Sequence, residues 1–108
     1  MEDHSVYKEC IDACLRCAAA CDHCAEACTK EKDTAMLAAC IRHDLECAAI
    51  CYATARLMSL ESGKARIIAK LCGELCEACA AECEKHDHDH CRVCAKACRE
   101  CAEACNRL

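Results

Sequence analysis

The chain has 108 residues, a formal net charge of −5 at neutral pH and a hydrophobic fraction of 56%. Proline, phenylalanine and tryptophan are absent and glycine occurs only twice, so β-strands and β-turns lack most of the residues that favour them. The sequence has no basic patch of the kind that binds nucleic acid, and it has no apolar run long enough to cross a bilayer. We therefore expect one all-α domain over residues 1–108.

Polar breaks divide the chain into four expected helices. The first begins near Asp3 or Ser5 and ends near residue 29, and the second extends from a cap at Asp33 to about residue 60. The third covers about residues 65–85, and the fourth begins within 87–90 and ends near 107. Short connectors make successive helices antiparallel neighbours, which predicts an up-down-up-down four-helix bundle.

Eighteen cysteines recur mostly at steps of three and four residues, the period of side chains on one face of a helix. In an ordinary bundle Leu and Ile fill these inward positions, whereas here thiols fill them. The predicted fold is therefore an antiparallel bundle with a cysteine-lined core. These candidate metal ligands are Cys10, Cys14, Cys17, Cys21, Cys24, Cys28, Cys40, Cys47, Cys51, Cys72, Cys76, Cys79, Cys83, Cys91, Cys94, Cys98, Cys101 and Cys105.

The first five residues, MEDHS, lack the positive region and apolar stretch of a secretory signal, so we expect a cytoplasmic protein. In a reducing compartment, dense cysteine favours metal binding over disulfides. Cysteines three or four apart on one helix are also about 5–6 Å apart at Cβ, which is too far for a disulfide.

The identity of the metal follows from softness and charge. Thiolates prefer soft ions such as Cu(I), although zinc also accepts them. Four thiolates around one Zn²⁺ leave a net charge of −2, and several such sites are unfavourable in a dry core. Cu(I) balances thiolate one for one, so bridging sulfurs can hold several Cu(I) ions per chain as neutral clusters.

Other thiol chemistries fit less well. The two-residue cysteine gaps lie within a helical rhythm rather than in zinc-knuckle turns, and none is followed by the histidine of a haem-attachment site. No pair of cysteines is distinguished as a catalytic pair, so we do not expect an enzyme. Two alternatives stay open: a general zinc or cadmium thiol buffer, and a redox-active thiol protein.

The chain resembles the bacterial copper storage proteins, specifically their cytosolic branch. The resemblance rests on the inward cysteines of all four helices and on the segments CIRHDLEC (residues 40–47) and ECEKHDHDHC (residues 82–91), and it covers nearly the whole chain. It implies storage and buffering of Cu(I) in thiolate clusters inside a four-helix bundle, assembly into a homotetramer, and exchange with copper-donating or copper-accepting thiols.

Asp44 occupies an inward position between Cys40 and Cys47, where an unpaired carboxylate is costly to bury. It either pairs with a cation or hydroxyl at the edge of the bundle, or binds or steers an incoming metal ion. We include it among the candidate metal ligands.

Three histidines, His86, His88 and His90, crowd the junction before the fourth helix. They are either part of a solvated connector or form a mouth at which imidazoles receive copper before the thiols do. His90 is the candidate ligand among them, because it immediately precedes Cys91. His23 and His43 fall outside the cysteine stripe, and we expect them to face solvent.

Two methionines, Met36 and Met58, are expected near the inward face at opposite ends of the second helix. A thioether is a soft ligand, but methionine also serves as a flexible filler of cores, and the sequence leaves both roles open. We expect Tyr7 and Met58 to close the end of the bundle opposite the three histidines.

Apolar residues also occur outside the inward stripe of the first two helices. They form an expected exposed strip composed of Ile11, Leu15, Ile41, Leu45 and Tyr52. A contiguous strip of this kind is typical of a protein–protein interface and predicts a homo-oligomer.

Overall fold

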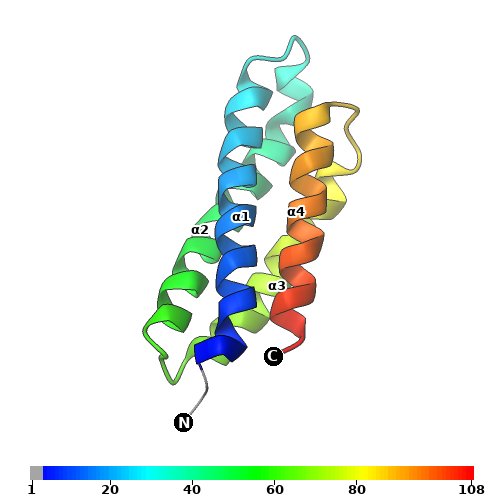
Figure 1. Ribbon diagram of the computed structural model, residues 1–108. Coiled ribbons are helices and arrows are strands. Elements are labelled where there is room, and N and C mark those ends of the chain that lie inside the picture. Colours follow the sequence, from blue (N-terminus) through cyan, green and yellow to red (C-terminus); the bar gives the residue numbers. More distant parts are fainter. Residues whose placement is uncertain (1–3) are drawn as a thin grey trace.

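The computed structural model describes residues 4–108, which form four antiparallel α-helices and no strand (Figure 1). The helices are α1 (His4–Thr29), α2 (Ala38–Ser59), α3 (Ala65–Cys83) and α4 (Asp89–Asn106), and a short 3₁₀ helix, η1 (Thr34–Leu37), precedes α2. The predicted all-α, up-down-up-down bundle is confirmed. No helix within the described residues is long and apolar enough to span a membrane.

Each helix packs against two neighbours: α1 and α3 both contact α2 and α4. The bundle is 51 Å long and 17 Å wide, so its core is one narrow column along the axis. The connectors at residues 30–37 and 84–88 share one end, which we call the histidine end. The connector at residues 60–64, the start of α1 and the end of α4 share the other, which we call the terminal end (Figure 1).

The helix boundaries differ from expectation in two places, the start of α2 and the end of α3. The 3₁₀ turn delays the start of α2 to Ala38, and the side chain of Asp33 makes no capping hydrogen bond, so the cap prediction is wrong. Helix α3 ends at Cys83 rather than near residue 85. Ser5 lies inside α1, and Asp3 lies outside the described residues.

The turn between α2 and α3 contains a residue in the left-handed region, Glu61, with φ of 52°. The Glu61 N–H donates to the Met58 carbonyl at 3.0 Å and the Ser62 N–H to the Leu57 carbonyl at 2.9 Å, which are the two hydrogen bonds of a Schellman helix end. A residue other than glycine pays about 1–2 kcal/mol for this conformation. The helix therefore stops at a defined residue without glycine.

The core between the helices consists mainly of cysteine and alanine. Larger fully buried side chains are few: Leu37 lies in η1, before α2, and Met58 lies near the end of α2. Tyr7, near the start of α1, is also buried. The predicted closure of the terminal end by Tyr7 and Met58 is consistent with this burial.

Candidate metal centre

All eighteen cysteines face the core, and all are free thiols. Sixteen have no solvent-exposed surface, and only Cys10 and Cys105 keep 1% and 3%. The four helices bring these thiols to common levels along the axis. The predicted inward orientation is therefore confirmed for every cysteine.

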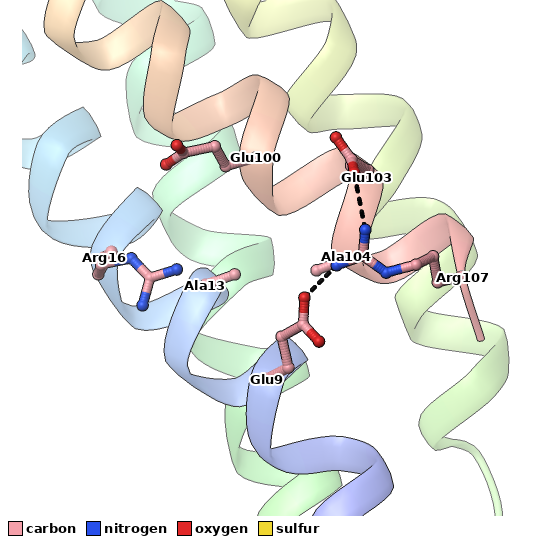
Figure 2. Close-up of a pocket in the computed structure, with 7 residues that line it drawn as sticks. All are labelled: Glu9, Ala13, Arg16, Glu100, Glu103, Ala104 and Arg107. Carbon is pink, nitrogen blue, oxygen red and sulfur yellow. Dashed lines mark hydrogen bonds and ion pairs between the residues drawn. The ribbon is translucent and has the colours of Figure 1, made fainter.

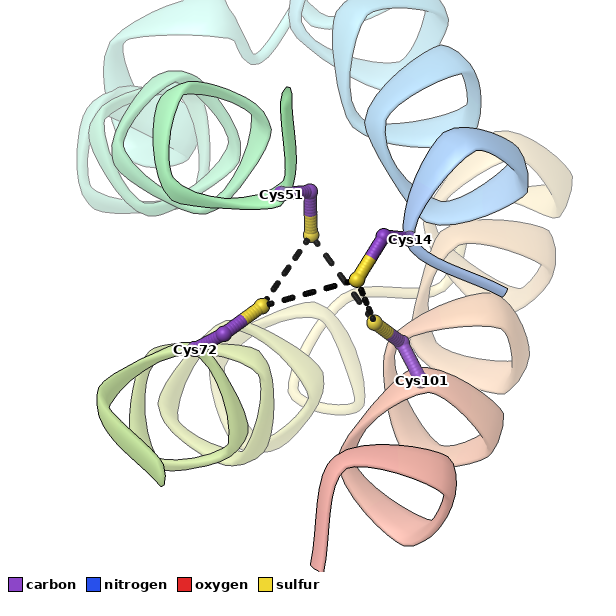
Figure 3. Close-up of side chains that lie close together, drawn as sticks. All are labelled: Cys14, Cys51, Cys72 and Cys101. Atoms are coloured by element: carbon purple, nitrogen blue, oxygen red, sulfur yellow. Dashed lines mark hydrogen bonds between the residues drawn. The ribbon is translucent and has the colours of Figure 1, made fainter. Parts of the chain in front are cut away.

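Figure 3 shows one such level, in which each helix contributes one sulfur: Cys14, Cys51, Cys72 and Cys101. Adjacent Sγ atoms around this ring are 3.6–4.0 Å apart. Sulfurs about 2.3 Å from a bound zinc ion would lie about 3.8–4.0 Å from one another. The four sulfurs thus already stand at distances that suit three- or four-coordinate soft metal ions.

Neighbouring levels share sulfurs. Cys51 and Cys101 belong both to the quartet with Cys14 and Cys72 and to the next quartet, with Cys17 and Cys76. Further quartets repeat this sharing toward the histidine end, where Cys24, Cys28, Cys40 and Cys91 converge. The thiols therefore form a continuous column rather than separate four-thiolate cages. A continuous column favours bridging thiolates, which Cu(I) accepts.

Burial is the first cause that raises the pKa of two thiols at the histidine end, that of Cys28 to about 11 and that of Cys91. These two thiols are neutral near pH 7. Elsewhere in the column, hydrogen bonds from neighbouring thiols lower the pKa of Cys10 to about 5 and that of Cys40 to about 2. A metal ion that binds Cys28 or Cys91 must displace their protons.

Asp44 completes the inward stripe of α2 and is fully buried. Thiols of three cysteines donate to its Oδ1: Cys79 and Cys94 at 3.3 Å and Cys83 at 3.6 Å. Burial is the first cause that raises the pKa of this carboxyl, to about 8. The structure therefore places Asp44 among the sulfurs, with thiols as partners rather than the cation or hydroxyl considered from the sequence.

His90 covers the last sulfurs at the histidine end. Its Nδ1 lies 3.5 Å from Cys24 Sγ, 3.6 Å from Cys91 Sγ and 3.9 Å from Cys28 Sγ. Its Nε2 lies 2.7 Å from a carboxylate oxygen of Glu31. An ionised carboxylate only accepts, so Nε2 carries the proton and the Nδ1 lone pair faces the thiols.

The other two histidines of the mouth also pair with carboxylates. His88 stacks on His90 with ring centroids 5.2 Å apart, and its Nε2 lies 3.2 Å from Asp33. His86 Nε2 lies 2.8 Å from Glu82, one helical turn earlier in the chain. These hydrogen bonds lower the pKa of Asp33 and of Glu82. Within residues 4–108, the imidazoles of His86 and His88 hydrogen-bond to carboxylates and not to core thiols, unlike that of His90.

The expectation for Met36 is wrong. Its side chain is 76% exposed, because the 3₁₀ turn changes the phase of the chain and points Leu37 into the core instead. Met58 is fully buried in the α2 stripe, as expected. His23 is exposed, as expected, whereas His43 is half-buried.

Two features of the site are not among the expectations from the sequence. Glu31 lies in the connector before α2, and the antiparallel pairing of the helices brings it beside His90. Thr54 continues the inward steps of three and four residues after Cys51. It is buried, and its hydroxyl has no hydrogen-bond partner among the described residues.

A surface cavity between α1 and α4 offers no competing metal site. It is lined by alanines and by charged residues, with no cysteine or histidine: Glu9, Ala13, Arg16, Glu100, Glu103, Ala104 and Arg107 (Figure 2). Arg107 pairs there with Glu9 and, at 2.7 Å, with Glu103. The three carboxylates of this cavity are hard ligands and two arginines lie among them, so the soft-donor site is the buried column.

The site can now be compared with known proteins. An uncharacterized cysteine-rich protein of Bacillus subtilis, YhjQ, is 47% identical over 97 residues, which cover 90% of this chain and 88% of that protein. The structure of the Cu(I)-bound copper storage protein BsCsp3 matches with a TM-score of 0.92 and 47% identity, over 95% of this chain and 97% of that one.

A cytosolic copper storage protein from Streptomyces lividans, described with five coppers, matches with a TM-score of 0.93 and 44% identity, over 96% of this chain and 92% of that one. The sequence profile of the copper storage protein family matches residues 3–108. The chain, with its column of free buried thiols, belongs to the copper storage protein family.

Proposed function

We propose that this chain stores and buffers Cu(I) as thiolate-bound ions or clusters inside its four-helix bundle. The observation that carries the proposal is the continuous column of eighteen inward thiols, whose quartets share members. Two relatives with nearly the same fold support it. One, 47% identical, is a Cu(I)-bound copper storage protein, and the other, 44% identical, is a copper storage protein described with five coppers. The role is non-catalytic: the bundle holds copper and exchanges it with donor and acceptor thiols.

Charge favours Cu(I) over a divalent ion in this column. One Cu(I) ion and one thiolate form a neutral unit, whereas each four-thiolate zinc site has a net charge of −2. The S···S distances alone suit either metal. Stoichiometry therefore separates copper storage from a general zinc or cadmium buffer.

Metal titration of the fully reduced protein under anaerobic conditions tests the proposal. We expect Cu(I) to bind until about one ion per thiol is present. Saturation by Zn²⁺ or Cd²⁺ at about one ion per four thiols, with Cu(I) stopping at the same number, would support the divalent buffer instead. Rapid modification of only two or three thiols would support redox chemistry.

All eighteen cysteines are proposed ligands, with Asp44 and His90 as additional ones. His90 contributes Nδ1 at the histidine end, where its ring already faces three sulfurs. Asp44 lies in the half of the column nearer the histidine end, and its Oδ1 accepts hydrogen bonds from three thiols. We propose that copper is first received by the mouth formed by His86, His88 and His90.

Replacement of all three mouth histidines by alanine tests this uptake route. Copper uptake should slow while the capacity changes little, because all eighteen thiols remain. Copper uptake by this triple variant at the wild-type rate would show that the three histidines do not receive copper first.

We also propose that the chain is a single domain of residues 1–108 acting in the cytosol as a homotetramer. The cytosolic Streptomyces lividans relative supports the location. The strip on α1 and α2 supports self-association, because Leu15, Leu45 and Tyr52 are about half exposed there. Shallow cavities of about 480 and 250 Å³ lie along the same face, beside Leu15 and Leu45 respectively.

A further inference from the structure

The inward stripe of α2 contains a hydroxyl beside its sulfurs. Steps of four, three and four residues lead along this stripe through Cys47, Cys51, Thr54 and Met58. The side chain of Thr54 has no exposed surface, and its Oγ1 has no hydrogen-bond partner. Among the described residues, it is the one buried side-chain oxygen or nitrogen without a partner. Thr54 therefore carries an unused hydrogen-bond donor inside the thiol column.

This hydroxyl is unfavourable in the empty protein. A threonine or serine within a helix often turns its hydroxyl back onto a carbonyl of the preceding turn. Ser59 does so on the same helix, with its Oγ donating to the Ala55 carbonyl at 2.8 Å. Thr54 makes no such bond, and a buried hydroxyl without a partner destabilises a fold relative to valine, which has the same shape. A buried group that breaks this rule indicates a function outside the stability of the empty bundle.

Thr54 belongs to the level of the column that follows the quartet of Figure 3 toward the terminal end. Each helix that contributes a cysteine to that quartet contributes one residue here, three or four positions further along and so displaced by about 4.5–6 Å. We call these four buried residues the terminal level: Cys10 of α1, Thr54 of α2, Ala69 of α3 and Cys105 of α4. The Sγ atoms of its two cysteines are 3.3 Å apart. Thr54 thus occupies the α2 position that holds a cysteine in the quartet before it.

Copper binding changes which groups near this level can donate. In the empty protein the sulfurs hydrogen-bond to one another, because Cys10 Sγ lies 3.3 Å from Cys105 Sγ and 4.0 Å from Cys14 Sγ. A cysteine that is bound to Cu(I) carries no proton and can only accept. The S–H donors are therefore lost as copper enters, whereas the hydroxyl of Thr54 keeps its proton.

The hydroxyl is suited to contact sulfur rather than copper. Its oxygen is a hard ligand, and Cu(I) prefers soft ones. A hydrogen bond from O–H to a thiolate is charge-assisted, and it is stronger in a dry core than in water. The hydroxyl thus interacts more favourably with a filled level than with an empty one, and this difference favours copper binding.

We infer that Thr54 determines the affinity of the terminal level for copper, because its hydroxyl donates to a thiolate of Cys10 or Cys105 once Cu(I) is bound there. This inference rests on the proposed storage function. Thr54 is a positioning residue, since it acts through the sulfurs and does not bind the metal. It compensates for a level that has two thiols where the quartet before it has four.

The test compares two replacements of Thr54 in the full chain. Thr54→Val keeps the shape and removes the hydroxyl, and Thr54→Ser keeps the hydroxyl. Thr29→Val is the matched control, because Thr29 is exposed at the end of α1, where it donates to the Glu26 carbonyl at 2.6 Å. Each protein is loaded with Cu(I) under anaerobic conditions and titrated with bicinchoninate, a Cu(I) chelator that reports the copper it removes by its colour.

A second pair of proteins isolates the terminal level. Cys10 and Cys105 are both replaced by alanine, with and without Thr54→Val, which completes a mutant cycle. Copper that wild type binds and the chain without these two cysteines does not bind is assigned to the terminal level. The cycle therefore shows whether Thr54 acts through those sulfurs.

Thr54→Val should weaken binding of the terminal-level copper about three- to tenfold, the net effect of one hydrogen bond. Thr54→Ser and Thr29→Val should bind copper as wild type does, and Thr54→Val should have no effect in the chain without Cys10 and Cys105. In reduced metal-free protein, Thr54→Val should raise the urea midpoint, because it removes the unpaired hydroxyl. A residue that only fills space would not change stability and copper affinity in opposite directions.

Three results of the copper titration would overturn the inference: unchanged binding by Thr54→Val, equal weakening by Thr54→Ser, or an equal effect of Thr54→Val without Cys10 and Cys105. A lower urea midpoint for metal-free Thr54→Val would also overturn it. That result would show that the hydroxyl already has a partner, such as a buried water, in the empty protein.

The total copper capacity of wild type is measured first, which separates this inference from the storage proposal. A wild-type chain that fails to load about one Cu(I) per thiol contradicts storage itself. A chain that loads fully, with copper binding that does not depend on Thr54, contradicts only the role of this hydroxyl.

Discussion

Glu31 and His90 are joined by a 2.7 Å hydrogen bond between a connector and a helix that are far apart in sequence. The bond fixes the ring of His90 so that Nδ1 faces the sulfurs of Cys24, Cys28 and Cys91. A carboxylate behind a histidine both selects its tautomer and raises its basicity as a ligand. The polar connector thus contributes directly to the mouth of the thiol column.

Glu31→Gln is therefore expected to slow the first phase of copper uptake about tenfold, because the ring loses its anionic partner. The total capacity should not change. Stopped-flow absorbance of the Cu(I)–thiolate bands measures the rate. Glu26→Gln is the control, since Glu26 is exposed on α1 and pairs only with Lys30 at 3.2 Å. A wild-type rate for Glu31→Gln would exclude the positioning role.

Asp44 makes the stability of the empty protein depend on pH. Its pKa of about 8 in the bundle compares with about 3.9 in an unfolded chain. Between these values the native state holds one more proton than the unfolded state, so the free energy of unfolding falls as pH rises. The contribution of the protonated carboxyl is complete below about pH 4 and is lost as pH rises through about 8.

Asp44→Asn should remove this dependence, because the amide does not titrate and its carbonyl can still accept from Cys79 and Cys94. Urea unfolding of reduced metal-free protein at pH 5, 6 and 7 measures it. The stability of wild type relative to Asp44→Asn should fall by on the order of 1 kcal/mol per pH unit. Parallel pH profiles for the two proteins would show that Asp44 ionises normally in the bundle.

Copper binding should release protons. Burial raises the pKa of Cys28 to about 11 and raises that of Cys91, so these thiols are protonated near pH 7. Each thiol that is protonated in the empty protein loses one proton when it binds copper, so protons are expected to appear as Cu(I) reaches Cys28 and Cys91. A pH indicator in weakly buffered anaerobic solution counts these protons during titration. Loading without proton release would mean that the empty column already holds thiolates.

Self-association should depend on the strip formed by α1 and α2. Replacement of both Leu15 and Leu45 by Glu places charge on that face and should lower the molar mass measured by light scattering to that of a monomer. Leu71→Glu is a matched control, because Leu71 lies on α3 and is 47% exposed, close to the 46% of Leu15. A tetramer that survives the double change but not Leu71→Glu would place the interface on α3.

The sequence was sufficient to predict the bundle and its eighteen inward thiols, because a repeat of three and four residues has one interpretation on a helix. Asp44 was found for the same reason, since it occupies a position in that repeat. Thr54 could have been found in this way as well. The period defines which side chains share the core, whatever their chemistry.

The carboxylates behind the histidines could not be predicted in the same way. Glu31 and Asp33 lie in a connector without helical period, and their partners are 55 or more residues away in the chain. The wrong prediction for Met36 has the same origin, because a 3₁₀ turn before α2 changes which residues face the core at the start of that helix. Connector geometry depends on local hydrogen bonds that residue spacing does not encode.

Diffraction from a crystal of the Cu(I)-loaded protein, measured on both sides of the copper absorption edge, tests the central claim most directly. The anomalous signal should place multiple copper ions along the bundle axis, each bound by sulfurs from at least two helices, with the outermost ion at the histidine end beside His90 Nδ1. Copper confined to surface carboxylates and histidines, or a core in which the cysteines are paired as disulfides in protein kept reduced, would contradict it.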